Sequence, residues 1–207
     1  MNGLLKKAVA EFVGVTLFLT AIISATQMQD TRFANVALAT TLGLMILLTA
    51  STSGGHLNPA VSLYFLAKKA IGVVAFIVYV VAQLAGAAVG VMLGNTLAGT
   101  THAAAASSGN LTGDLIGELV ATAILVWLVG HLAANNHGDK IPFAVGAWVL
   151  AASMFTLTGA QANPAVAFGL LTTGADGTWI AQVVIAQVLG ALVAVVGTMF
   201  VTSAAKK

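Results

Sequence analysis

Long apolar runs separated by short polar stretches dominate the chain. Each run is about as long as the roughly 20 residues that a helix needs to cross a bilayer. They cover residues 4–27, 33–52, 70–97, 111–134, 142–158 and 179–203, and the fifth only just reaches the required length. Because apolar runs of this length recur along the whole sequence, the pattern predicts an integral membrane protein built of helices.

Two further apolar stretches, residues 53–69 and 159–178, are interrupted and too short to span a bilayer. Each contains an Asn-Pro-Ala motif after a run with glycine. Asparagine is a good helix N-cap, and proline at the first helical position loses no hydrogen bond, so each motif predicts a helix start. Paired interrupted segments in two halves of a chain indicate a polar pathway at the membrane midplane. The motifs are Asn58, Pro59, Ala60 and Asn163, Pro164, Ala165.

The two halves of the chain repeat one another. The asparagines of the two motifs, Asn58 and Asn163, are 105 positions apart, and the segments around them also correspond. Three spanning segments in each half is an odd number, so the halves must have opposite orientations. We therefore expect a single all-α membrane channel domain over residues 1–207, with six transmembrane helices, two re-entrant half-helices and an inverted 3+3 repeat. The repeats cover about 1–100 and 108–207.

Composition and charge agree with a membrane location and predict an orientation. Only 7% of the residues are charged and the mean hydropathy is +1.00, whereas a soluble domain carries about 25% charged residues. Cytoplasmic termini would leave only Arg32 outside, which fits the positive-inside rule. We expect a multi-pass protein of the cell inner (plasma) membrane with both termini cytoplasmic. The residues inside would be Lys6, Lys7, Lys68, Lys69, Lys140, Lys206 and Lys207.

The doubled motif, the run from Gly54 to Val61 and the segments around Glu11, Gln83 and Glu118 resemble the aquaporin/aquaglyceroporin family, the major intrinsic proteins. The resemblance covers nearly the full length. It implies a passive channel for small neutral solutes that forms a homotetramer in the lipid bilayer. It also implies that backbone carbonyls before each motif form a ladder of acceptors for the solute. These carbonyls belong to Gly54, Gly55, His56, Leu57, Gly159, Gln161 and Ala162.

Several side chains are of types that often act in catalysis or proton transfer, but we do not expect them to have such a role here. Glu11 and Glu118 are ionisable groups inside spanning segments, where such residues are functional or paired. They could form a proton-coupling pair, but the resemblance places them behind the re-entrant loops as acceptors for loop N–H groups. His56 is favoured as a loop-packing residue over a gate. We see no nucleophile–base set and no metal cluster, so we expect no enzyme, cofactor, metal or nucleic-acid partner.

The sequence departs from the family at the narrowest part of the pore. The position three residues after the second asparagine is nearly always arginine in the family, and here it is Val166. The spacing of the family places the other constriction residues at Leu38, Ala151 and Ala160. All four are apolar, and position 167 is alanine where glycerol facilitators have aspartate. Removing arginine deletes a fixed charge and its donors, so we expect a wide, apolar selectivity filter.

The expected solutes are water, glycerol-type polyols, and neutral metalloid or arsenic species. Family members with valine at this position include bacterial channels linked to arsenic compounds. The apolar filter could instead close by dewetting and conduct poorly. The alternatives that stay open are a strict water channel and a secondary transporter, because inverted repeats and broken helices occur in transporters too.

Overall fold

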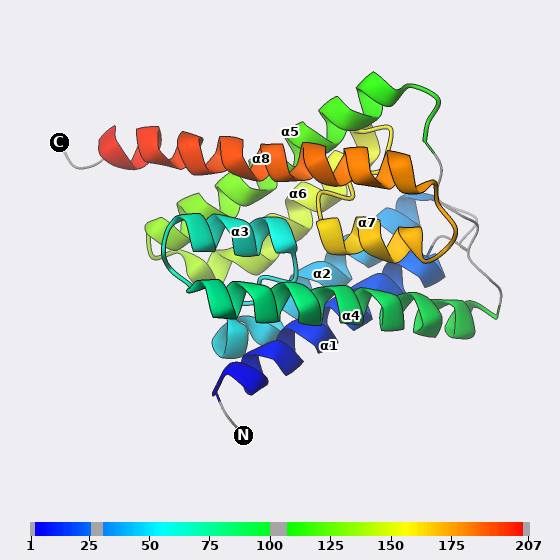
Figure 1. The fold of residues 1–207 in the computed structure, drawn as a ribbon, viewed down its shortest axis with the longest axis horizontal. Helices are drawn as coiled ribbons and strands as arrows, with labels where there is room; N and C mark the ends of the chain where they lie inside the picture. Colours follow the sequence, from blue (N-terminus) through cyan, green and yellow to red (C-terminus); the bar gives the residue numbers. More distant parts are fainter. Residues whose placement is uncertain (1–2, 26–30, 100–106, 205–207) are drawn as a thin grey trace.

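The computed structural model describes residues 3–25, 31–99 and 107–204, and in these ranges the chain is helical with no strand (Figure 1). Some expected features lie outside the described residues: Lys206, Lys207, and the end of the first expected segment at residues 26–27. The elements are α1 (Gly3–Ala25), α2 (Thr31–Ser53), α3 (Pro59–Ala67), α4 (Val73–Ala98), α5 (Leu111–Ala134), η1 (Gly138–Lys140), α6 (Ile141–Phe155), α7 (Pro164–Leu171) and α8 (Gly177–Ala204).

Five of these helices, α1, α2, α4, α5 and α8, are long and apolar enough to cross a membrane. The helix α6 has 15 residues, fewer than the expected segment 142–158, and spans about 22 Å. It ends early because Thr156 is extended and caps the helix, with its N–H donating to the Ala152 carbonyl. The chain then turns into the loop that carries the second motif, and the short 3₁₀ helix η1 adds length at the other end.

The long helices pair within each half of the chain, α1 with α4 and α5 with α8. Glycines allow the backbones to approach: a Cβ on Gly86 or Gly90 of α4 would lie 2.5 Å from a carbonyl oxygen of α1, at Phe12 and Thr16. A Cβ on Gly190 of α8 would lie equally close to a carbonyl of α5. Close backbone approach is what stabilises helix pairs in lipid, where the hydrophobic effect gives no driving force between helices.

The half-helices α3 and α7 lie end to end in the middle of the molecule, between the long helices (Figure 1). Each begins at the proline of its motif, and their N-terminal ends face one another across the loops that precede them. The fold thus brings the two motifs, which are far apart in sequence, to one place.

Candidate functional site

Each asparagine of the two motifs caps its own half-helix. The Asn58 side-chain oxygen accepts a hydrogen bond of 2.8 Å from the backbone N–H of Ala60, and the Asn163 oxygen accepts one of 2.9 Å from that of Ala165. Both asparagines have extended backbones and are followed by proline. The positive ends of two helix dipoles therefore point at the centre of the molecule.

The same two side chains also join the halves of the chain. The Asn58 amide nitrogen donates to the carbonyl of Ala162 at 2.8 Å, and the Asn163 amide nitrogen donates to the carbonyl of Leu57 at 2.9 Å. Each bond thus ends on the residue just before the opposite asparagine. A side-chain amide nitrogen carries two N–H groups. Each asparagine therefore uses one N–H in the bond to the opposite loop and has a second N–H that this bond does not use.

The loops before the motifs have an unusual backbone. Positive φ angles occur at equivalent places in both loops, at Gly54, Gly55 and Leu57 and again at Gly159, Ala160 and Ala162. A left-handed conformation costs roughly 1–2 kcal/mol for a residue with a side chain, so the surrounding structure has to hold it. It is held by two buried acids.

In the first half, the fully buried Glu11 of α1 accepts four hydrogen bonds. Its Oε1 accepts from the Ser53 hydroxyl at 2.5 Å and from the backbone N–H of His56 at 3.0 Å. Its Oε2 accepts from the N–H of Leu57 at 2.6 Å and from the Gln83 amide at 2.7 Å. The carboxylate thereby fixes the loop residues on both sides of the His56–Leu57 peptide.

In the second half, the equally buried Glu118 of α5 accepts the same pattern of bonds. Its Oε1 accepts from the Thr158 hydroxyl and from the N–H of Gln161 at 2.9 Å. Its Oε2 accepts from the N–H of Ala162 and from the Gln187 amide, both at 2.8 Å. A buried charge is tolerated when such donors surround it, which explains two glutamates in spanning helices.

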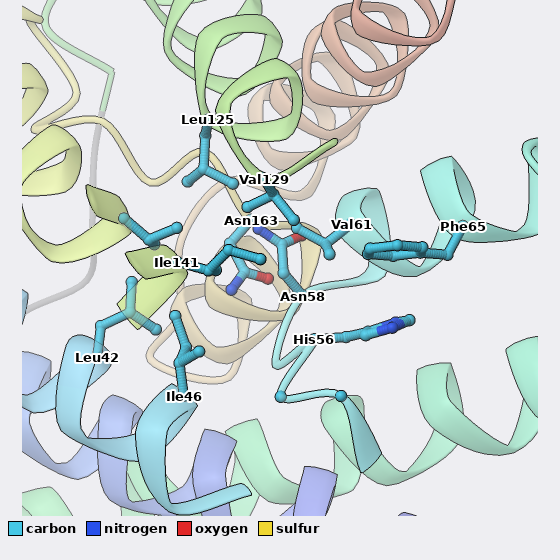
Figure 2. A pocket seen from close by; sticks show the side chains of 13 residues that line it. Leu42, Ile46, His56, Asn58, Val61, Phe65, Leu125, Val129, Ile141 and Asn163 are labelled. Carbon is cyan, nitrogen blue, oxygen red and sulfur yellow. The ribbon is translucent and has the colours of Figure 1, made fainter. Parts of the chain in front are cut away.

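A small cavity of about 40 Å³ lies beside the two asparagines, on the side of α3 (Figure 2). Asn58, Asn163 and His56 provide its polar side chains, and the loop glycines Gly54 and Gly55 also reach it. The rest of its wall is apolar and comes from four helices. These residues are Leu42, Ile46, Val61, Phe65, Leu125, Val129, Ile141 and Val145.

His56 packs against its neighbours in this wall. Its Nδ1 lies 3.1 Å from the Ser62 hydroxyl, its ring stacks on Phe65 with 4.7 Å between ring centroids, and Tyr79 meets it edge-on. The Tyr79 hydroxyl in turn donates to the Ser53 carbonyl at 2.6 Å, at the end of α2. The imidazole is thus wedged between α3 and α4.

The four residues expected at the filter differ in their burial. Val166 and Ala160 are buried in the apolar core, and the half-buried Leu38 packs against that core. Ala151 is exposed, whereas the next residue, Ala152, is 1% exposed and belongs to the core. One residue corresponds to about 100° of rotation around a helix, so Ala151 points away from the core face of α6.

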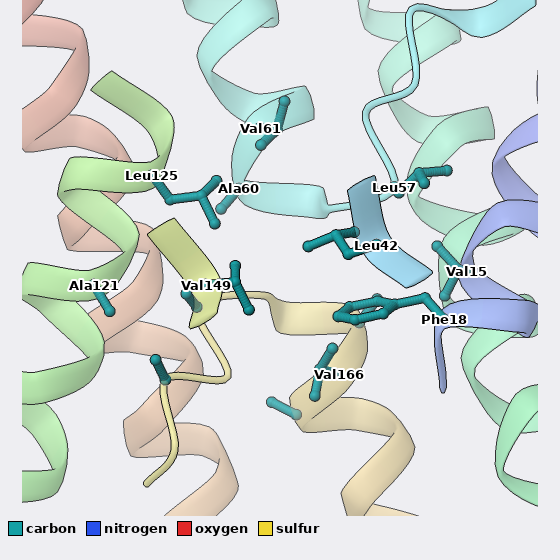
Figure 3. Close-up of a cluster of buried hydrophobic side chains, with 14 of the residues drawn as sticks. Val15, Phe18, Leu42, Leu57, Ala60, Val61, Ala121, Leu125, Val149 and Val166 are labelled. Atoms are coloured by element: carbon teal, nitrogen blue, oxygen red, sulfur yellow. The ribbon is translucent and has the colours of Figure 1, made fainter. Parts of the chain in front are cut away.

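Two side chains that the sequence did not single out lie in the core with Val166. Phe18 of α1 points its ring toward Leu42 and Val166, and Val149 of α6 lies near Leu125 (Figure 3). An apolar residue inside an apolar helix carries no motif, so only the helix rotation seen in the structure could have found them. The hydroxyls of Ser53 and Thr158 were missed for a different reason: their role depends on where the glutamates lie in the fold.

Comparison with known proteins agrees with this geometry. The family model described as major intrinsic protein matches residues 2–196. The chain belongs to the major intrinsic protein family. Members of this family are passive channels for small solutes, not enzymes, and the chain is accordingly a multi-pass membrane channel.

Individual members of the major intrinsic proteins match over most of the chain. Aquaglyceroporin AqpS of Rhizobium meliloti (strain 1021) is 29% identical over 204 residues, covering 92% of this chain and 88% of that protein. Aquaporin TIP2-2 of Zea mays is 32% identical over 201 residues, covering 85% and 80%. The solved aquaglyceroporin of Plasmodium falciparum has the same fold, with a TM-score of 0.82, 22% identity and coverage of 93% and 94%.

We predict that Glu118→Gln destabilises the protein, because a glutamine amide would turn N–H groups toward loop donors that now bond a carboxylate. An unsatisfied buried donor costs about 1–3 kcal/mol. Thermal unfolding in detergent should therefore shift down by about 5 °C or more. The matched control is Asp139→Asn in η1, an exposed carboxylate whose replacement should leave the midpoint unchanged. Equal midpoints for both variants would contradict the role of Glu118 in holding the loop.

Proposed function

We propose that this chain conducts small neutral solutes, namely water, glycerol-type polyols and neutral metalloid or arsenic species, along the two re-entrant loops and past Asn58 and Asn163. The observation that carries the proposal is the exchange of hydrogen bonds between these two asparagines and the opposite loops. It sets two amide donors and two helix dipole ends at one point of the path. Donors at the centre suit a solute oxygen, and the positive potential there repels cations.

In this proposal the backbone carbonyls before each motif accept hydrogen bonds from the solute. The loops combine residues with positive φ and residues with negative φ, so successive peptide groups turn in different directions. At membrane depth, non-helical backbone is tolerated only where protein buries it or where it lines a watery path. The carbonyls concerned are those of Gly54, Gly55, His56, Leu57, Gly159, Gln161 and Ala162.

The filter that we propose consists of Leu38, Ala160 and Val166, with Val149 in the place that spacing alone assigns to Ala151. Val149 and Val166 belong to one buried core, whereas Ala151 is exposed. A filter of this kind offers no side-chain donor and no fixed charge. Hydrated ions would lose their water there without replacement, so only neutral solutes would pass.

We also propose a single channel domain of two inverted repeats, about 1–100 and 108–207, in a homotetramer in the plasma membrane. The start of α1 and the end of α8 lie at the same end of the molecule as the end of α3 (Figure 1). Lys68 and Lys69 follow α3 directly, and Lys140 lies in the α5–α6 connection. Basic residues gathered at one end support cytoplasmic termini under the positive-inside rule.

A strict water channel is the second candidate, and the small size of the cavity favours it. Room of about 40 Å³ beside the asparagines accommodates a few water molecules. A polyol would need the surrounding side chains to move. A transporter coupled to protons has less support, because every oxygen of Glu11 and Glu118 already accepts hydrogen bonds from the protein.

The direct test is stopped-flow light scattering on proteoliposomes with the purified full chain. We expect permeability above that of empty liposomes for water and for at least one of glycerol, urea and arsenite. Passage of glycerol, urea and arsenite all at rates similar to the empty control, with fast water passage, would select the strict water channel. Permeability equal to the control for water and for every neutral solute would contradict the proposed function.

We predict that Val166→Arg lowers glycerol permeability about tenfold, roughly 1.4 kcal/mol in the barrier, and water permeability less. The long guanidinium would narrow the filter and add donors that water uses better than a bulkier solute does. The control is Ala151→Leu, which adds bulk on the exposed side of α6 and should change neither permeability. A fall in glycerol passage in Ala151→Leu would show that position 151, and not Val149, lines the filter.

A further inference from the structure

We propose that Gln161 determines which solutes pass, because its side-chain amide oxygen accepts a hydrogen bond from a hydroxyl of the solute. The inference deepens the proposed function and rests on it. It adds a polar side chain between the filter residue Ala160 and the motif residue Asn163, where the filter side chains themselves are apolar. It also names the class of solute that this side chain favours, small neutral polyols.

The side-chain oxygen of Gln161 is buried and has no hydrogen-bond partner among the residues that the structure describes. Three other buried side-chain oxygens share this property, those of Gln83, Thr122 and Gln187. These three residues are fully buried and closed to a solute, whereas Gln161 is half-buried. A buried acceptor without a partner costs about 1–3 kcal/mol. A donor from a passing molecule would remove this cost at Gln161.

Gln161 occupies the position in the second loop that His56 occupies in the first. The backbone N–H of each donates to the Oε1 of the glutamate behind its loop, at 3.0 Å for His56 and 2.9 Å for Gln161. The residues before and after each of them have positive φ angles of similar size. These angles are 61° at Gly55 and 49° at Leu57, against 53° at Ala160 and 45° at Ala162. Because the two backbones have the same shape, the two side chains leave their loops in equivalent directions.

In the first half, this direction leads to the proposed path. His56 is one of the polar side chains that line the small cavity beside the asparagines, and Figure 2 shows its ring at the edge of that cavity. By the same geometry, the Gln161 amide borders the path on the other side of the asparagines, the side of α7. In the chain it stands directly after Ala160 and two residues before Asn163.

The two positions differ in the partner that the half-helix supplies. The His56 Nδ1 lies 3.1 Å from the hydroxyl of Ser62, which is in the first turn of α3. The two asparagines are 105 positions apart, and at this offset Ser62 corresponds to Ala167 of α7, which has no hydroxyl. The second half thus lacks the group that pairs with the side chain in the first. This difference explains why the Gln161 oxygen has no partner.

A polyol fits an additional acceptor at this place better than water does. A polyol has several O–H groups that lose their water together in the filter, whereas a water molecule has two. The proposed carbonyl acceptors lie on the loops, so another acceptor lowers the cost of dehydration most for the solute with the most donors. The glutamine amide also carries N–H donors for a solute oxygen. Because the amide is neutral, the positive helix ends still repel cations.

The test removes the amide and keeps the length of the side chain. In proteoliposomes of the purified full chain, we expect Gln161→Met to lower glycerol permeability about fivefold, roughly 1 kcal/mol in the barrier. Water permeability should fall less than about twofold, because the loop carbonyls still serve its two O–H groups. A defect of folding or insertion would lower both permeabilities in parallel, so the ratio of glycerol to water permeability decides the test. Gln161→Leu, a second apolar variant, should lower this ratio in the same way.

The matched control is Gln182→Met, the same substitution at a half-buried glutamine of α8, outside the loops. Its ratio of glycerol to water permeability should equal that of the unmodified protein. An unchanged ratio in both Gln161 variants, with unmodified protein that conducts glycerol, would overturn the role of Gln161 and leave the channel standing. Unmodified protein that excludes glycerol but passes water or another neutral solute would overturn the assignment of polyols. Unmodified protein that conducts nothing would count against both proposals.

Discussion

Two buried carboxylates hold the two re-entrant loops in place at the centre of this molecule. Glu11 and Glu118 each accept four hydrogen bonds, two of them from backbone N–H groups of a loop that has left helical geometry inside an apolar bundle. Without these acceptors, the loop N–H groups would be orphaned at membrane depth, where water cannot satisfy them. The positive φ angles of Leu57 and Ala162, the aim of the half-helices and the exchange between the asparagines all depend on this support.

In both halves a hydroxyl and an amide bond the glutamate that holds the loop, but the side chains around this arrangement differ. Ser53 and Thr158 are equivalent hydroxyls, and Gln83 and Gln187 are equivalent amides on α4 and α8. The environments then diverge. On the α3 side, His56, Phe65 and Tyr79 fill the space beside the path, while the α7 side is packed with Phe18, Val149 and Val166. The two halves thus share one frame and differ in the side chains packed around it.

Much of the frame could be predicted from the sequence, because the rules involved are local. Apolar runs of spanning length correctly predict the five long helices, and the Asn-Pro pairs correctly predict the starts of α3 and α7. Rotation of a helix about its axis is not local, since it depends on packing with neighbours. Counting residues back from the second motif places Ala151 at the filter, but only the structure shows that α6 turns Ala152 and Val149 toward the core. The end of α6 at Phe155 could not be predicted for a similar reason. Threonine is compatible with a helix, and Thr156 is extended because the chain turns there into the loop that follows.

Both acids are committed to holding the loops, so we expect that solute movement is not coupled to protons. The most direct measurement is the final internal concentration of labelled glycerol, or of whichever solute passes, in proteoliposomes with an imposed pH gradient. This account predicts that the solute reaches the same concentration inside and outside, whatever the direction of the gradient. Accumulation against the solute's own concentration gradient would contradict it, because it would require Glu11, Glu118 or another group to carry protons through the membrane.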